Sequence, residues 1–90
     1  MQIVVQKKGK SGEQFEVLCG YDKRLDYVFM CVYDKEENLI YDNLALPNAL
    51  EIKDFDFFSL KAKDLFGIDL KDEHEEINQY QQIEKAKQFF

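Results

Sequence analysis

The sequence predicts an α+β domain in which a four-stranded, mostly antiparallel sheet is followed by two helices packed on one of its faces. Three observations lead to this prediction. Short apolar segments recur along the first half of the 90-residue chain, and turn-forming residues separate them. The second half instead carries apolar residues at helical spacing. A chain of this length supports one modest core, so we expect residues 1–90 to form a single domain.

The four strands are expected at residues 2–7, 14–21, 27–33 and 39–41. The second strand alternates apolar and polar residues, which places one side of it against the core. Its inward residues are expected to be Phe15, Val17, Cys19 and Tyr21. The third strand, YVFMCVY, is apolar on both faces and is typical of a central strand.

An internal sequence similarity favours a meander of antiparallel strands. Residues 15–26 (FEVLCGYDKRLD) align without gaps on residues 27–38 (YVFMCVYDKEEN), and both copies contain Cys-x-Tyr-Asp-Lys. The resulting twelve-residue period fits one strand and its connecting turn. Cys19 and Cys31 have the same phase in the two copies, and we expect Phe29 and Cys31 to face the core.

The segment at residues 43–53 carries apolar residues around Pro47, which cannot donate a hydrogen bond to a neighbouring strand. This segment is therefore expected to be an edge segment or an extended connection. A helix follows it, with Asp54 or Asp56 as the N-cap.

The first helix is expected to end at Gly67 in the left-handed conformation, with Ile68 making the closing hydrophobic contact. The last helix is expected to start near Asp72, which together with Glu75 resembles a capping box. Its apolar stripe consists of Ile77, Tyr80, Ile83, Ala86 and Phe90. The helical residues that we expect to be buried are Phe58, Leu65 and Ile83.

The net charge of −6 is unevenly distributed. Residues 1–24 contain five basic and three acidic residues, whereas residues 25–90 contain seven basic and fifteen acidic residues. An acidic surface repels phosphate backbones, so we expect no direct contact with nucleic acid.

Targeting signals and cysteine usage indicate where the protein resides. No segment approaches the roughly 20 apolar residues that span a membrane. The first residues lack the pattern of a signal peptide. Both cysteines fall in apolar strands, as small buried side chains do in a reducing compartment. We therefore expect a cytoplasmic protein with free thiols and no contact with a membrane.

No pattern of residues predicts catalysis, a metal or a cofactor. The segment GKS at residues 9–11 lacks the first glycine of a phosphate-binding loop, because Val4 stands at that position. Residues 34–38 have oxygen ligands at a calcium-loop spacing, but the glycine and glutamate that such a loop needs do not follow. His74, the only histidine, is expected to be solvated among acidic neighbours. The chain is therefore expected to be non-enzymatic.

The strongest indication of function is that the chain has more apolar residues than a core on one face of the sheet needs. Two helices of this length cover one face of a small sheet, so apolar residues on its other face would form an interface. The alternative is that residues 44–52 fold over that face. On the third strand, Val28, Met30 and Val32 are expected to face away from the core. The candidate partner-binding residues are Val28, Met30, Val32, Phe57, Leu60, Glu73, Glu75 and Glu76.

These observations predict a small acidic protein-binding module that contacts either another protein or a second copy of itself in a homodimer. The alternative function is an inhibitor of the type that phages and mobile elements encode. Such an inhibitor would occupy the nucleic-acid site of a basic target by acidic mimicry.

Overall fold

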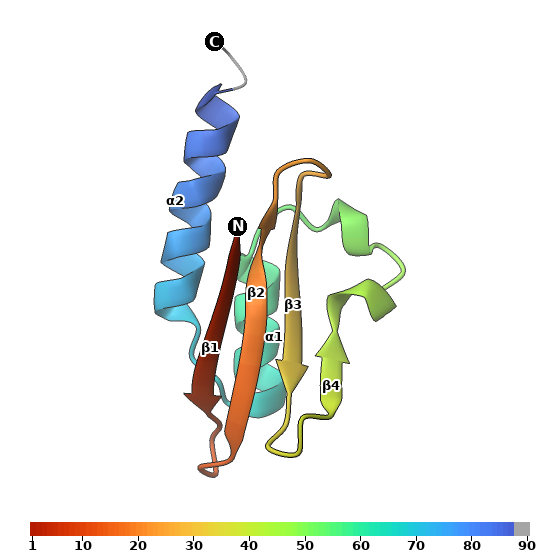
Figure 1. Cartoon of the computed structure of the whole chain (residues 1–90), viewed down its shortest axis with the longest axis vertical. Coiled ribbons are helices and arrows are strands. Elements are labelled where there is room, and N and C mark those ends of the chain that lie inside the picture. Colours follow the sequence, from red (N-terminus) through yellow and green to blue (C-terminus); the bar gives the residue numbers. More distant parts are fainter. Residues whose placement is uncertain (88–90) are drawn as a thin grey trace.

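The computed structural model describes residues 1–87 and contains four strands followed by two α-helices (Figure 1). The strands form one antiparallel sheet in the order β1-β2-β3-β4. Their bounds are β1 Gln2–Lys8, β2 Gln14–Asp22, β3 Tyr27–Tyr33 and β4 Leu39–Asp42. The helices, α1 Asp56–Phe66 and α2 Lys71–Lys87, share one hydrophobic core with a single face of the sheet. The predicted α+β fold and its element order are thereby confirmed.

The inward face of the sheet is set by the register between β2 and β3. Tyr21 pairs with Val28, Cys19 with Met30, and Val17 with Val32. Directly opposed residues of an antiparallel pair lie on the same face, so all of these side chains point toward the helices. Every one of them is fully buried.

The prediction that Val28, Met30 and Val32 face away from the core is therefore wrong. The reason is the four-residue turn between Asp22 and Tyr27, which are paired with each other. With this turn, odd-numbered residues of β2 oppose even-numbered residues of β3. The internal similarity has a period of twelve residues, so it matches odd-numbered residues of β2 with odd-numbered residues of β3. It therefore predicts the wrong buried face for β3.

Four residues expected in the core lie outside it. Phe29 and Cys31 are only half-buried, because they occupy the face of β3 opposite the helices. Leu65 and Ile83 are 56% and 55% exposed, respectively. Phe58, in contrast, is fully buried, as expected.

The connection between β4 and α1 is not extended. It forms two short 3-10 helices, Asn43–Ala45 and Ala49–Glu51. The Asp42 carboxylate caps the first by accepting a hydrogen bond from the Leu44 N–H at 2.9 Å. The connection then returns to the sheet, where the Val28 N–H donates to the Ile52 carbonyl at 3.0 Å. These contacts help to close the core over the end of β3.

The end of α1 is as predicted. Gly67 has a φ of 68°, and its N–H bonds the Lys63 carbonyl at 3.0 Å. The Ile68 N–H bonds the Ala62 carbonyl at 3.1 Å, and the Ile68 side chain is buried. The prediction that Asp54 or Asp56 is the N-cap of α1 is wrong, because Phe55 occupies that position and makes no side-chain capping hydrogen bond. The Asp54 side chain, one residue earlier, accepts from the Asp56 N–H at 2.9 Å and so satisfies a terminal donor.

Helix α2 begins slightly earlier than expected, at Lys71. The carboxylate that satisfies its first N–H belongs to Asp69, at 2.9 Å, rather than to Asp72. Of the predicted stripe, Ile77 is buried and Tyr80 is half-buried against the ring of Tyr21. Phe90 lies outside the described residues.

Polar contacts also fix α2 against the sheet and the chain before α1. The buried Gln81 side chain donates to the Lys53 carbonyl at 2.7 Å. Lys7 Nζ lies 3.0 Å from Glu73 Oε1 across the interface with β1. Within residues 1–87, no helix combines the length and the apolar character needed to cross a bilayer.

Candidate functional site

The face of the sheet opposite the helices is the candidate site, and we call it the uncovered face. Its residues alternate with the buried ones along each strand. The strand register aligns them in rows across the sheet. One row is Val4, Leu18, Cys31 and Asp42, and the next is Gln6, Glu16, Tyr33 and Leu39.

The centre of the uncovered face is apolar. Val4 is 54% exposed, and Leu18, Cys31 and Tyr33 are half-buried although no described helix lies above them. Phe29 belongs to the same face, where its ring lies over Gly20. A Cβ at Gly20 would lie 2.9 Å from the Phe29 ring, so glycine permits this close approach.

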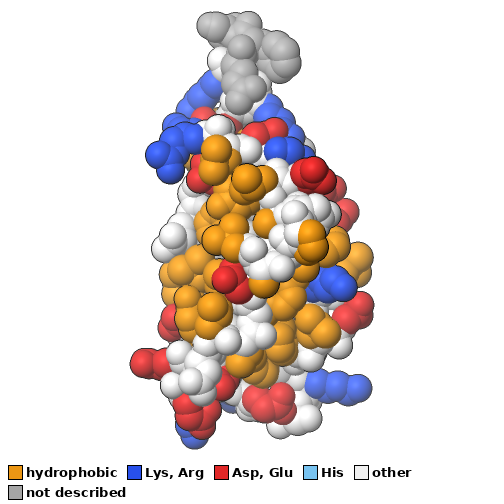
Figure 2. All heavy atoms as spheres, turned by 90° about the vertical axis from the view of Figure 1, so that its right-hand side faces the viewer, with side chains coloured by type: hydrophobic (Ala, Val, Ile, Leu, Met, Phe, Trp, Pro, Cys, Tyr) orange, Lys and Arg blue, Asp and Glu red, His pale blue; other side chains and the backbone are white. Residues whose placement is uncertain are grey.

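Apolar side chains continue around the edge formed by β4 and the two 3-10 helices. Figure 2, which faces this edge, shows hydrophobic side chains gathered across the middle of the molecule with charged groups mainly around them. The exposed residues on these elements are Leu39, Ile40, Leu44 and Leu50. Contiguous apolar surface of this kind typically marks a site of contact with another macromolecule.

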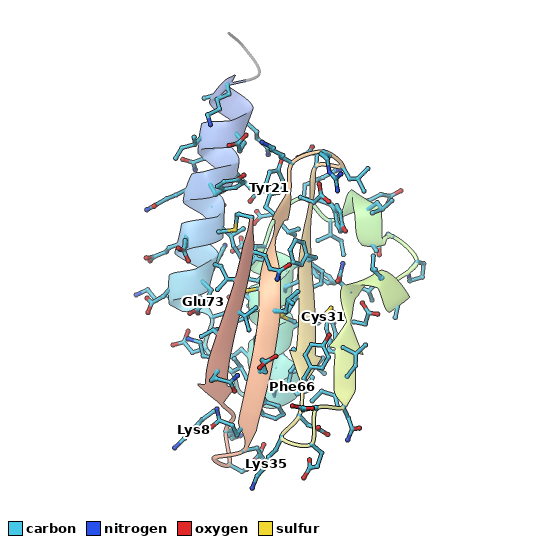
Figure 3. The ribbon with its side chains drawn as sticks, viewed as in Figure 1. Lys8, Tyr21, Cys31, Lys35, Phe66 and Glu73 are labelled. Carbon is cyan, nitrogen blue, oxygen red and sulfur yellow. The ribbon has the colours of Figure 1, made fainter. Side chains whose placement is uncertain are left out.

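One end of the uncovered face is hollowed into a groove of about 520 Å³. The groove lies where the β3–β4 turn meets β1 and β2. Figure 3 shows Lys8 and Lys35 at this end of the sheet and Cys31 further along it. The lining includes Gln6, Gln14, Glu16, Tyr33, Asp34 and Glu37.

The structure separates the residues that the sequence suggested for partner binding. Val28, Met30 and Val32 are in the core and cannot be reached without unfolding. Phe57 and Leu60 are 38% and 62% exposed. They are three residues apart on α1, which makes them neighbours on the surface of that helix.

The two side chains have different neighbours. Leu60 lines a hollow with Ser59 and His74, on the side that faces α2. Phe57 instead carries Lys61, whose Nζ lies 5.6 Å from the ring centroid. Both residues lie on α1, which packs on the face of the sheet opposite the uncovered face, so neither belongs to the candidate site.

The acidic side chains at the start of α2 do not form a continuous row of exposed carboxylates. Glu73 is only 12% exposed at its side chain and is held by Lys7. The contact is an ion pair rather than a well-aligned hydrogen bond, since the same oxygen has no hydrogen-bond partner. Glu75 and Glu76 remain exposed. Mimicry of a regular series of phosphates would therefore lack the contribution of Glu73.

The two thiols lie on opposite faces of the sheet and are both free. Burial, with smaller contributions from Glu73 and Glu76, raises the pKa of Cys19 from 9.0 to about 12. Burial and the nearby Asp42 carboxylate also raise the pKa of Cys31. Raised pKa values keep both thiols protonated at neutral pH, which disfavours them as nucleophiles.

His74 is half-buried rather than solvated. Its Nε2 atom lies 3.1 Å from Asp56 Oδ1, and its ring packs beside Phe55. Ligand atoms of Asp54, Asp56 and His74 lie within 4.8 Å of one another. The hydrogen bond from the Asp56 N–H to Asp54 and the contact between Asp56 and His74 already account for this cluster.

Sequence reasoning missed the outward residues of β2, above all Glu16 and Leu18. A signal was present, because the alternation of β2 correctly predicts its inward residues and leaves Glu16 and Leu18 outward. The inward residues are Phe15, Val17, Cys19 and Tyr21. Counting register across the turn to β3 would then have assigned Tyr33 and Cys31 to the same face as these two residues.

Comparisons of the chain with protein families, with curated proteins and with solved structures found no match.

Proposed function

We propose that this chain is a non-enzymatic protein-binding module and that its contact surface is the uncovered face of the sheet with the adjoining β4 edge. The observation that carries the proposal is that the helices cover only one face of the sheet. Both helices pack on the same face, and the other face carries a row in which Val4 is exposed and Leu18 and Cys31 are half-buried.

The charge of the chain favours a particular kind of partner. Glu16 and Asp42 flank the apolar centre, and the whole chain carries a net charge of −6. A second copy would bring the same charges to the contact, whereas a protein with a basic surface would complement them. The partner that fits is therefore a protein that presents apolar side chains with positive charges beside them.

The β4 edge offers a second means of attachment. β4 has a neighbour on one side only, and its Leu39 and Ile40 are exposed. Edge strands have unpaired backbone groups, to which an extended segment of a partner can add as a further strand. Such pairing would place the partner beside the uncovered face.

Selection of short peptides against the protein tests the proposal. Random peptides displayed on phage would be selected against the wild type, and a recovered peptide would be titrated calorimetrically. We expect Leu18→Lys to weaken binding by about tenfold or more, because it places a charge in the apolar centre. Circular dichroism would confirm that the variant is folded.

Leu60→Lys is the matched control, because it adds the same charge at an exposed position on α1. We expect it to change the affinity by less than about twofold. If the two variants weaken binding equally, or if every recovered peptide is indifferent to Leu18→Lys, the uncovered face is not the contact surface.

A further inference from the structure

The groove at the end of the uncovered face has the composition of a receptor for a cationic side chain. Its floor is the row Gln6, Glu16 and Tyr33, contributed by three adjacent strands. The β3–β4 turn forms its wall. The lining carries three carboxylates, those of Glu16, Asp34 and Glu37, and a single ammonium group, that of Lys35.

The Glu16 side chain accepts a hydrogen bond from a neighbour on β1 and still has an oxygen atom that can accept from a ligand. The Gln6 side chain donates to Glu16 Oε2 at 2.7 Å, and Gln14 donates to Gln6 Oε1 at 3.3 Å. This relay fixes the Glu16 carboxylate above the sheet. Within residues 1–87 Glu16 has no ion-pair partner, and its Oε1 atom accepts no side-chain hydrogen bond.

The other charged groups near the groove are less suited to receive a ligand. Asp34 is engaged by its own turn, where it accepts from the N–H groups of Glu36 and Asn38 and from the Asn38 side chain. Glu37 is exposed on the turn. Lys35 lines the groove, and Lys8 lies near the same end of the sheet, so they compete weakly with an incoming cation.

We propose that this groove binds an arginine side chain of the protein partner, with the guanidinium group beside Glu16 and against the ring of Tyr33. A guanidinium group is planar, stacks on aromatic rings and donates several hydrogen bonds to carboxylate and amide oxygens. Glu16 and Tyr33 are directly paired across β2 and β3, so their side chains are neighbours on the uncovered face. A lysine ammonium group would make the ion pair but would lose the planar stacking.

This inference rests on the proposed function, since it names the chemistry that the partner presents at one end of the contact surface. The probe is a short oligoarginine peptide, compared with an oligolysine peptide of equal length. Calorimetry and ¹H–¹⁵N spectra of the labelled protein would measure affinity and location. We expect the oligoarginine to bind more tightly and to shift the signals of Glu16 and Tyr33.

Glu16→Gln is the critical variant, and Glu75→Gln on the exposed face of α2 removes the same charge elsewhere. We expect Glu16→Gln to weaken oligoarginine binding about fivefold and Glu75→Gln to weaken it by less than about twofold. Tyr33→Leu should remove the preference for arginine over lysine. Lys35→Gln should strengthen binding by removing the competing ammonium group.

Equal weakening by Glu16→Gln and Glu75→Gln would overturn the inference, because the peptide would then respond only to net charge. Signal shifts confined to α2 would overturn it as well. If oligoarginine fails in either way while phage-selected peptides still depend on Leu18, the arginine site is wrong and the proposed function stands. If neither probe depends on the uncovered face, both are wrong.

Discussion

Phe29 and Met30 are neighbours on β3, yet their side chains have different surroundings. Met30 is fully buried between the sheet and the helices, whereas Phe29 is half-buried on the uncovered face. Size alone would make the aromatic residue the stronger contributor to stability. Burial reverses that order, because the cost of truncation depends on the cavity that is left behind.

We therefore expect Met30→Ala to lower the free energy of unfolding by about 2–5 kcal/mol. Phe29→Ala should cost less, about 1–2 kcal/mol, because solvent already reaches part of its ring. Urea titration of both variants checks this order. A larger loss for Phe29→Ala would show that the two faces of β3 are reversed.

Cys19 and Tyr21 make stability depend on pH above neutrality. The pKa of each is raised to about 12, from 9.0 for the thiol and 10.0 for the phenol. Burial is the main cause for both, and for Tyr21 the hydrogen bond to Asp26, at 2.7 Å, adds to it. The folded state thus holds these protons more tightly than the unfolded chain.

The free energy of unfolding should therefore be unaffected by these groups below about pH 9 and should fall as the pH rises toward 12. Urea titrations at a series of pH values measure the fall. Tyr21→Phe and Cys19→Ala should each reduce the slope in this range, although each also costs stability at neutral pH. A slope identical to that of the wild type in both variants would contradict this assignment.

At the scale of elements, two glycines with positive φ differ in whether a Cβ atom at that position would collide with a neighbour. Gly12 has a φ of 85° and open space where a Cβ would lie. Gly67 has a φ of 68°, and a Cβ there would lie 2.7 Å from the Lys10 backbone nitrogen. The end of α1 is thus packed against the β1–β2 turn, where the Lys10 N–H also bonds the Phe66 carbonyl at 3.2 Å.

Gly12→Ala should cost about 1 kcal/mol through its backbone conformation alone. Gly67→Ala should cost at least about 2 kcal/mol, because the turn must also move away. Thermal or urea unfolding of the pair checks the difference. Equal losses would show that α1 does not press against the turn.

The elements differ in how far the sequence could predict them. Strand 27–33 was predicted with the bounds that it has, and the end of α1 at Gly67 followed from local chemistry. The 3-10 helices after β4 depend on the Asp42 cap and on the bond between Val28 and Ile52, which local propensity does not contain. The buried face of β3 is set by its register with β2, which is a non-local property. The twelve-residue internal similarity predicted the opposite face.

At the scale of the whole molecule, the chain builds a core on one side of its sheet only. The apolar content of β3 is divided between that core and the uncovered face, which explains why this strand reads as hydrophobic throughout. The helices pack on one face of the sheet, and the other face carries partly exposed apolar side chains. The residues on that other face differ from those predicted, because Leu18, Cys31 and Tyr33 take the place of Val28, Met30 and Val32.

Charge repulsion between copies leads us to expect a monomer in solution at physiological ionic strength, despite the exposed apolar surface. Sedimentation equilibrium over a range of concentrations measures this directly. A dimer that Ile40→Lys dissociates, with folding unchanged, would show instead that the β4 edge pairs with a second copy. The uncovered face would then belong to an interface between copies.

The most direct measurement is mapping of a phage-selected peptide onto the protein by ¹H–¹⁵N chemical-shift changes. The changes should concentrate on β2, β3 and β4, at positions such as Leu18, Cys31 and Tyr33, and should leave the exposed side of α2 near Glu75 unchanged. Changes concentrated on α2 or on the Leu60 side of α1, with the sheet unaffected, would contradict the proposal that the uncovered face binds the partner.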